Sequence, residues 1–221
     1  MNGRASAVVL STLAVKGVLD ETLAGFGRDS GFRYEVQIHA TQALLEILRR
    51  GDPADLLIMT AEGIDSLKLA RSDLGRSGVG VAVRSGAAKP RIDNLEAFRK
   101  AIAEAESVAH SRVGASGLYF ARLIGELGIK PKRIVIVDKG PVALAVARGE
   151  AELGVQQLCE LAPVKGIEIV GPFPDEVQVY TTFSAGIPSS SRCAGAAQAL
   201  VEFLRSQTAR EAMRRNYMEP A

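Results

Sequence analysis

Hydroxyl and small residues directly follow four apolar segments of the sequence, at the points where helical patterns begin. In open α/β sheets, ligands bind outside the carboxyl ends of the strands, where the first N–H groups of the next helix have no partner within that helix. Those N–H groups and the positive end of the helix dipole favour a negatively charged ligand. The four positions therefore predict a cage of neutral donors around a small anion. They are Ser11-Thr12, Thr41-Gln42, Ser111 to Ser116-Gly117, and Pro141-Val142.

Each of these hydroxyl residues also has a simpler interpretation, as the N-cap of its own helix. A Ser or Thr N-cap stabilises a helix by about 1 kcal/mol and needs no ligand. For any one position taken alone, the N-cap is the better interpretation, and one residue can serve both purposes. The occurrence of four such positions in one chain favours the anion site.

Titratable side chains lie close to the same positions. His39 and His110 each follow a predicted strand, and Lys16 lies in the first turn of the first predicted helix. In an enzyme these three residues are the candidate bases. As structural residues, the histidines are satisfied within the fold and the lysine is solvated. No third ligand stands near either histidine in the sequence, so we predict no metal site and no cofactor.

Short apolar runs alternate with amphipathic segments along almost the whole chain. The runs are rich in Val and Ile and are bounded by polar residues or glycine, which is typical of buried strands. This alternation predicts an α/β fold with largely parallel sheets. The predicted strands are 7–10, 34–38, 55–59, 79–83, 108–110, 133–137, 153–155 and 167–170. The predicted helices are 14–27, 43–50, 61–70, 94–105, 117–127, 141–148 and 194–205.

Two longer extended segments, Val79–Arg84 and Gln178–Ile187, have no helical pattern within them. Two such strands running between two βα lobes would form a double hinge. We therefore predict a first lobe of residues 1–83 plus 183–221 and a second lobe of residues 84–182. The alternative is a single doubly wound sheet.

The composition is that of an ordinary folded protein and argues against several functional classes. The chain of 221 residues is 47% hydrophobic and 24% charged, with 27 Lys+Arg against 25 Asp+Glu. A formal net charge of +2 without a basic cluster argues against nucleic-acid binding. No apolar run reaches the roughly 18 residues that a membrane span needs. Cys159 and Cys193 stand apart and are predicted to be buried free thiols rather than a disulfide.

The first residues leave two localisations open. Arg4 followed by Ala5–Val15 has the length of a short signal peptide, but hydroxyl residues interrupt it and no small-x-small cleavage site follows before Lys16. The same stretch is predicted to form the first strand. The protein is therefore expected to be periplasmic if a leader has been removed, and cytoplasmic if there is none.

Five segments carry a resemblance to a known family through their order and spacing. Gly51–Ile58 resembles a G-x-PADV-x-I element, and Ser111–Gly117 resembles an S-D-P-x-A-S-G loop. Val146–Gly154 is similar to a V-x-x-GEA-x-x-G segment, and Phe183–Ile187 and Met218–Ala221 match a returning strand and a tail. Together these segments resemble the periplasmic molybdate-binding proteins of ABC transporters, over nearly the whole chain.

The resemblance implies the type II periplasmic-binding fold, in which two lobes are joined by two hinge crossings and the ligand lies in the cleft between them. It also implies a small anionic ligand and an ABC permease as a partner, with no nucleic acid and no membrane insertion. We further expect a monomer. Carried over residue by residue, the predicted ligand contacts are Ser11, Thr12, Thr41 (a serine in the family), Ser111, Ser116, Gly117, Pro141 and Val142.

Departures from the family pattern change the expected ligand. Gln156 and Gln157 stand where molybdate binders carry a tyrosine, and Arg112 stands where they tend to have aspartate. Arg84 is a second guanidinium, just past a predicted strand. Guanidinium groups bind carboxylates through two parallel hydrogen bonds, which a tetrahedral metal oxyanion does not need. With these four residues added to the contacts, we expect an organic di- or tricarboxylate, unless both arginines are solvated surface groups.

Three functions follow from these expectations. The first is a receptor of an ABC-type uptake system that closes on its anion by hinge motion. The second is an enzyme, because some proteins similar to this family are isomerases of unsaturated tricarboxylates such as aconitate. There, His110, His39 or Lys16 would remove an activated proton, and Arg84 and Arg112 would hold carboxylates. The third is a cytoplasmic ligand sensor.

Overall fold

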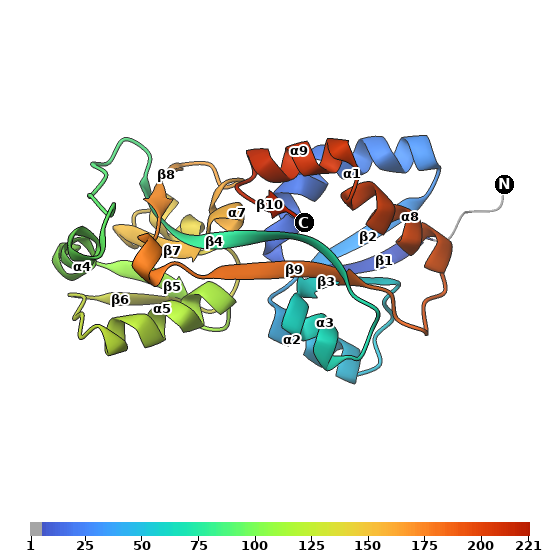
Figure 1. Cartoon of the computed structure of the whole chain (residues 1–221), viewed down its shortest axis with the longest axis horizontal. Coiled ribbons are helices and arrows are strands. Elements are labelled where there is room, and N and C mark those ends of the chain that lie inside the picture. The colour runs from blue at the N-terminus through green and yellow to red at the C-terminus, as the bar shows by residue number, and fades with distance from the viewer. Residues whose placement is uncertain (1–5) are drawn as a thin grey trace. The chain divides into compact units, whose positions relative to one another are not determined.

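The computed structural model describes residues 6–221, in which strands alternate with helices as the sequence predicts. Its contacts divide the chain into two units (Figure 1). Unit 1 consists of the residues up to Arg76 together with Thr181–Ala221, and unit 2 is Ser77–Tyr180. The two units divide between residues 76 and 77 and between residues 180 and 181. The predicted lobe boundaries, 83/84 and 182/183, lie seven and two residues further along the chain.

The sheet of unit 1 has three parallel strands and one antiparallel strand. β1 (Ser6–Ser11) lies between β2 (Arg33–Ile38) and β3 (Leu56–Thr60), and all three are parallel. β9 (Tyr180–Gly186) pairs with β3 in the antiparallel sense, from Phe183 to Gly186. A buried cluster that includes Leu10, Leu44, Leu57 and Met59 forms the core on the α2 side of this sheet.

Helices of unit 1 follow each of its strands. A short 3₁₀ helix, η1 (Leu13–Val15), leads into α1, and the left-handed residue Gly31 (φ 68°) ends α1. β10 (Glu219–Pro220) pairs with the first part of β4 at Gly75 and Arg76. The helices are α1 (Lys16–Ser30), α2 (Thr41–Arg49), α3 (Ala61–Ser66), α8 (Ala194–Leu204) and α9 (Gln207–Arg215).

Asp55 connects the two chain segments of unit 1. It directly precedes β3 and is only 6% exposed. One carboxylate oxygen accepts hydrogen bonds from Ser191 Oγ (2.9 Å) and from the amides of Arg192 (2.8 Å) and Cys193 (2.9 Å), and the other accepts from the amide of Val8 (2.9 Å). The aspartate of the predicted Gly51–Ile58 motif is therefore a structural anchor.

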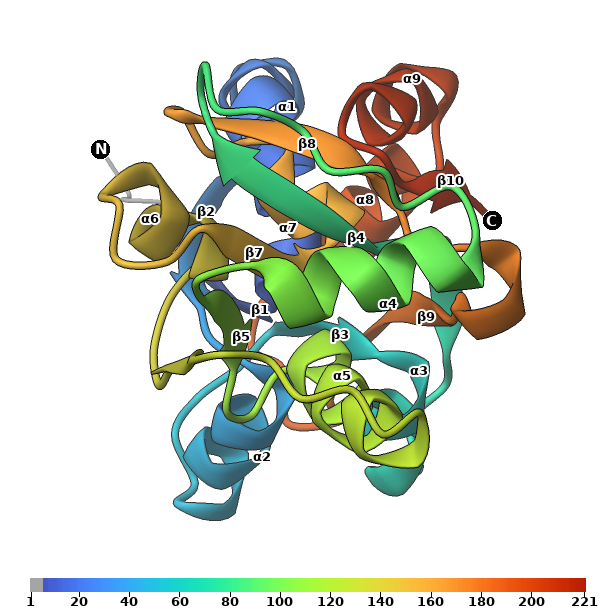
Figure 2. The ribbon, with the colours of Figure 1, turned by 90° about the vertical axis from the view of Figure 1, so that its left-hand side faces the viewer.

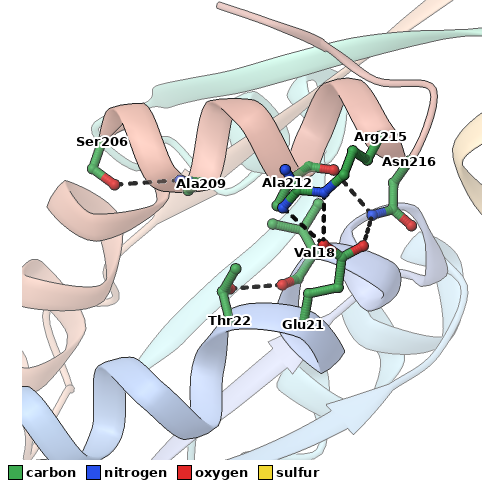
Figure 3. Close-up of polar contacts among 8 residues, drawn as sticks. All are labelled: Val18, Glu21, Thr22, Ser206, Ala209, Ala212, Arg215 and Asn216. Atoms are coloured by element: carbon green, nitrogen blue, oxygen red, sulfur yellow. Dashed lines mark hydrogen bonds and ion pairs between the residues drawn. The ribbon is translucent and has the colours of Figure 1, made fainter.

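A second polar cluster joins α1 to α9 (Figure 3). The Glu21 carboxylate accepts from Asn216 Nδ2 at 2.6 Å and from Arg215 Nη2 at 3.0 Å. A Cβ atom at Gly17 would lie 2.1 Å from Asn216 Oδ1, so the close approach of Asn216 to α1 requires a glycine there. The side chains thus hold the last helix of the unit against its first.

Unit 2 repeats the pattern of parallel strands beside one long antiparallel strand. β5 (Val108–Ser111) lies between β6 (Ile134–Val137) and β7 (Leu153–Gln157), and the three are parallel. The long strand β4 (Ser72–Arg84) is antiparallel to β7 and also to β8 (Ile167–Pro172). Each unit contains three parallel strands, and the predicted α/β fold is confirmed.

Helices cover both faces of this sheet because alternate residues of each strand point to opposite sides. Val81 and Val83 pack with α4 (Leu95–Glu104) and α5 (Ala115–Glu126), which lie on one face (Figure 2). Ala82 packs on the other face, with α6 and α7. These two short helices are α6 (Val142–Ala147) and α7 (Leu158–Leu161), and a 3₁₀ helix, η2 (Asp175–Val177), precedes β9.

Several elements differ from the prediction. β4 begins at Ser72, whereas the predicted strand began at Val79, because Leu74 is the one apolar side chain in residues 72–78 and these residues show no apolar pattern. α4 begins at Leu95, one residue later than predicted, after the N-cap Asn94, whose side chain accepts from the amide of Ala97. α7 and α9 had no predicted counterpart among the helical segments.

Other features of residues 6–221 concern membrane spans, metal sites and the two cysteines. Within this range no helix is both long and apolar enough to cross a bilayer. The same residues contain no group of three or more His, Cys, Asp or Glu side chains arranged to hold a metal ion. Cys159 and Cys193 are free thiols, the first buried and the second partly buried.

Candidate functional site

The carboxyl ends of the parallel strands in unit 1 lie at one edge of its sheet. Ser11, at the end of β1, is in register with Ile38 of β2 and Ile58 of β3. The amide of His39 donates to the Ser11 carbonyl oxygen at 2.9 Å, and the amide of Thr12 donates to that of Ile58 at 2.9 Å. The backbone therefore fixes the loop after β1 between its two neighbours.

Thr12 has the strongest indication of a binding role in unit 1. Its side chain is 4% exposed, and Oγ1 has no hydrogen-bond partner among the described residues. It is the N-cap residue of η1, but its hydroxyl makes no capping hydrogen bond, so capping does not account for the position of this hydroxyl. Leaving a buried hydroxyl unpaired costs about 1–3 kcal/mol, which a ligand atom would recover. Beside it, the fully buried Ser11 Oγ donates to the Thr12 carbonyl oxygen at 3.1 Å.

Thr41 lies at the start of α2 and reaches the end of β3. The N-cap of α2 is Ala40, so Thr41 does not cap its helix either. Its Oγ1 accepts a long hydrogen bond, 3.5 Å, from the amide of Thr60, and Thr60 Oγ1 caps α3 by accepting from the amide of Gly63 at 3.2 Å. Thr60 was missed from the sequence, although it follows a predicted strand and precedes a predicted helix as the chosen residues do.

The two candidate bases of unit 1 have different surroundings. Lys16 begins α1 and its ammonium group pairs with Asp20, one helical turn further on, at an exposed position. His39 follows β2, and its side chain is exposed. The structure thus gives Lys16 a carboxylate partner, while His39 stands at the strand-end edge beside Ser11.

In unit 2 the loop after β5 closes on itself around Ser111. Ser111 Oγ accepts from the amides of Val113 (3.3 Å) and Gly114 (2.9 Å). Gly114 is the N-cap of α5, so Ser116 is the second residue of the helix, and it is 2% exposed. A Cβ atom at Gly117 would lie 2.0 Å from the Ser111 carbonyl oxygen, which explains the glycine of this loop.

The start of α6 connects through a glutamine to an acidic side chain. The amide of Val142, which follows the N-cap Pro141, donates to Gln156 Oε1 at 2.9 Å. Gln156 Nε2 in turn donates to Glu160 Oε2 at 2.7 Å. Burial raises the pKa of Glu160 from 4.5 to about 7, although the Gln156 hydrogen bond lowers it. Gln156 and the neighbouring Gln157 are each 2% exposed.

Glu160 was missed from the sequence. The available signal was its position four residues after Gln156, in a short helix that begins where β7 ends. One helical turn brings two such side chains to the same side, so a glutamine and a glutamate at this spacing can contact each other.

The arginines do not join these groups as predicted. Arg112 is exposed and its guanidinium pairs with Asp138, which offsets the expected positive charge. Arg84 is five residues beyond Val79, the partner of Gln157, so it lies about 17 Å along β4 from that end. The structure therefore leaves Arg84 at the opposite end of the sheet of unit 2 from Gln156 and Gln157.

His110 is held inside unit 2. It is 5% exposed, its Nδ1 lies 3.1 Å from the Ser111 carbonyl oxygen, and its ring meets that of Phe120 edge-on with centroids 5.5 Å apart. A proton on Nδ1 satisfies the first contact. These contacts favour the structural interpretation of His110 over a role as base.

Each unit thus brings together part of the predicted set at the carboxyl edge of its own sheet. The groups are mostly neutral hydroxyl and amide groups, which can bind an anion without a counter-charge. Unit 1 contributes Ser11, Thr12 and Thr41, with Thr60 in addition. Unit 2 contributes Ser111, Ser116, Gly117, Pro141, Val142, Gln156 and Gln157, with Glu160 in addition.

Comparisons with known proteins agree on the family and the fold. A family described as bacterial extracellular solute-binding protein matches residues 7–219. A curated protein of a Pseudomonas species, aconitate isomerase, is 36% identical over 228 residues, which cover 96% of this chain and 87% of that protein.

Two solved structures show the type II periplasmic-binding fold, as predicted. The periplasmic molybdate-binding protein of Azotobacter vinelandii is 17% identical, with a TM-score of 0.78 over 96% of this chain and 98% of the other. The substrate-binding domain of a molybdenum ABC transporter protein from Clostridium difficile is 16% identical, with a TM-score of 0.70 over 98% and 99% of the two chains. At these identities the likeness extends to the fold alone.

Proposed function

Because the chain belongs to the family of bacterial extracellular solute-binding proteins, we propose that it binds a small organic di- or tricarboxylate for an ABC-type uptake system. The observation that carries this proposal is the buried hydroxyl of Thr12, which has no partner among the described residues. A ligand oxygen at that position would remove the cost of the unpaired group. A partner permease is part of the proposal.

The neutral character of the strand-end groups supports an anion as the ligand. Hydroxyl and amide groups can donate hydrogen bonds to carboxylate oxygens, and such bonds to a charged acceptor are stronger than neutral ones. Ser11, Thr12 and Thr41 supply these groups in unit 1, and Ser111 and Ser116 supply them in unit 2. Since Arg112 is paired with Asp138, we assign recognition to these neutral groups rather than to the arginines.

The choice of an organic acid over molybdate has two supports. Gln156 and Gln157 stand where the family resemblance expects a tyrosine, and the Val142 amide already bonds to Gln156 Oε1. In addition, the relative that is 36% identical is named for aconitate, an unsaturated tricarboxylate. The first observation removes a residue expected of molybdate binders, and the second favours a ligand with several carboxylates.

Calorimetric titration tests the proposal directly. We expect binding of cis-aconitate, trans-aconitate or citrate to be tighter than that of molybdate or sulfate. Thr12→Val keeps the shape of the side chain and removes its hydroxyl, so affinity should fall by roughly tenfold, the value of about one hydrogen bond. Thr22→Val is the matched control, because Thr22 Oγ1 donates to the Val18 carbonyl oxygen within α1. Lack of binding to every anion of the panel would refute the proposed function.

The match to aconitate isomerase favours a second candidate, catalysis on the same scaffold. The reaction would remove a proton from the methylene carbon of aconitate to a base and return a proton to the resulting allylic anion. Hydroxyl and amide donors would stabilise the carboxylates as negative charge spreads onto them. His39 is the predicted base that stands exposed at a strand-end edge.

Proton NMR of the protein with trans-aconitate in D2O tests the isomerase. Catalysis would produce cis-aconitate and exchange the methylene protons for deuterium, and both should slow in His39→Gln. Binding without any chemical change would leave the protein a receptor and remove this candidate.

A further inference from the structure

The amide of Gln156 lies between one group that can only donate and one that can accept. The Val142 N–H donates to Oε1 at 2.9 Å, and Nε2 donates to the Glu160 carboxyl at 2.7 Å. A glutamine amide has an acceptor end and a donor end, so an ionised Glu160 determines which end faces α6. In this arrangement Gln156 Oε1 accepts the hydrogen bond of the Val142 N–H, which is then not available to a ligand.

Within residues 6–221, Glu160 has no cation to compensate its charge. No Lys, Arg or His within residues 6–221 forms an ion pair with it. The elements packed against α7 are α6, β7, β8 and β4, and of these α6 and β7 contain no titratable side chain. β4 contains Asp73, Arg76 and Arg84; Asp73 pairs with Arg71 and Arg76 pairs with Glu219. Glu168 of β8 is engaged with Lys89 and the amide of Gly86, and Cys159 of α7 is a buried thiol whose pKa is raised by burial.

Both charge states of Glu160 are therefore accessible near neutral pH. Burial, the larger effect, raises its pKa to about 7, and the hydrogen bond from Gln156 opposes that shift. A carboxylic acid can donate a hydrogen bond, which a carboxylate cannot. Protonation thus changes what the Gln156 amide can do at its Glu160 end.

Protonation of Glu160 adds a second possible orientation of the Gln156 amide, because a carboxylic acid can accept from Nε2 and can also donate to Oε1. With Glu160 ionised, Nε2 faces the carboxylate and Oε1 faces the Val142 amide, as observed. With Glu160 protonated, its O–H can donate to Oε1 once the amide has turned over. Nε2 and the Val142 N–H then point toward each other, and an anionic oxygen between them would accept from both.

We propose that Glu160 is a positioning residue that sets the orientation of the Gln156 amide, so that binding of the anion is accompanied by uptake of a proton on Glu160. This inference rests on the proposed function, because it concerns how that same anion is admitted. In the empty state Gln156 Oε1 faces the Val142 amide. In the ligand-bound state the amide is turned over, so that Nε2 donates to the ligand and Oε1 faces Glu160.

The pH dependence of affinity tests the coupling. The probe is whichever of cis-aconitate, trans-aconitate or citrate binds most tightly, measured by calorimetry from pH 7 to pH 9, where the ligand carboxylates stay ionised. The dissociation constant of the wild type should rise by about tenfold per pH unit above the pKa of Glu160, since one proton is bound with each ligand. Glu160→Gln should flatten this dependence, and the exposed Glu176→Gln should keep it. Equal pH dependence in wild type and Glu160→Gln overturns the proposal.

A second measurement needs no ligand. The side-chain NH2 resonances of Gln156, assigned from their loss in Gln156→Leu, should shift with pH around an apparent pKa of about 7 in the wild type. They should be independent of pH in Glu160→Gln. Resonances that do not titrate in the wild type would overturn the proposed role of Glu160. If no ligand of the panel binds but the amide titrates, the proposed function fails while the positioning of Gln156 stands.

Discussion

Asp55 in unit 1 is buried and Glu160 in unit 2 is partly buried, and the pKa values of these two carboxyl groups move in opposite directions. For Asp55, burial raises the pKa, but hydrogen bonds from Val8, Ser191, Cys193 and Arg192 together outweigh it, so the pKa lies below 3.8. For Glu160, burial is opposed only by Gln156, and the pKa rises to about 7.

The difference shows that the number of donors, rather than burial alone, decides whether a buried carboxyl stays ionised. Asp55 is permanently charged near neutral pH and ties together distant parts of the chain. Glu160 has one donor and changes charge near neutral pH, which suits a group that responds to a ligand. Substitutions at three residues, Asp55, Glu160 and Glu21, test this comparison.

Asp55→Ala should have the largest effect. It leaves three amides and the Ser191 hydroxyl without their acceptor, so the free energy of unfolding should fall by about 4 kcal/mol. Urea denaturation measures the change. Hydrogen exchange at the amides of Arg192 and Cys193 should accelerate in parallel. A loss below about 1 kcal/mol would contradict the anchoring role.

Asp55→Asn provides the control through its dependence on pH. Since the folded pKa of Asp55 is lowered, its contribution to stability is present above 3.8 and is lost as the pH falls through the folded value. The difference in stability between wild type and Asp55→Asn should therefore shrink as the pH is lowered below 3.8. A difference that stays constant down to acid unfolding would mean that charge is not what matters.

Glu160→Gln should have an intermediate effect of the opposite sign. The folded pKa of Glu160 lies above its ordinary value of 4.5. The contribution of Glu160 to the free energy of unfolding is therefore fully present below pH 4.5 and is lost as the pH rises through about 7. The substitution should raise the free energy of unfolding by about 2 kcal/mol at pH 8 and change it little at pH 4. Denaturation at the two pH values checks this, and a destabilised variant at pH 8 would argue that the carboxylate is compensated.

Glu21→Gln should have the smallest effect. Glu21 also accepts several hydrogen bonds, from Asn216 and Arg215, but its side chain is 40% exposed. Exposed ion pairs contribute little because water and salt screen them, so we expect a loss of about 0.5 kcal/mol. A loss as large as that in Asp55→Ala would show that burial matters less than the number of donors. Denaturation at low and at high salt separates the contribution of the ion pair with Arg215 from that of the hydrogen bond with Asn216.

The architecture could be predicted because it is expressed in local patterns. Strands such as β1 and β3 are short apolar runs, and α4 has an apolar face that repeats along the helix. α7 was missed because its four residues are too few for a helical period to show. The local sequence also predicted that the hydroxyl residues Thr12 and Thr41 lie at the ends of strands.

The rest of the candidate site depends on contacts that the sequence does not encode locally. The pairing of Arg112 with Asp138 joins the ends of two neighbouring strands, and only the register of β5 with β6 reveals it. The position of Arg84 depends on β4 running antiparallel to β7. The link from Val142 through Gln156 to Glu160 requires knowing which helix starts over which strand.

Unit 1 is made of two stretches of chain separated by all of unit 2. Because the ribosome synthesises the N-terminus first, all of unit 2 is made before the part of β9 that pairs with β3. During that interval the edge of β3 is open, and an open strand edge can recruit other chains. A nascent molecule therefore passes through a stage in which this edge of β3 is unpaired, and that stage ends only when β9 has been synthesised.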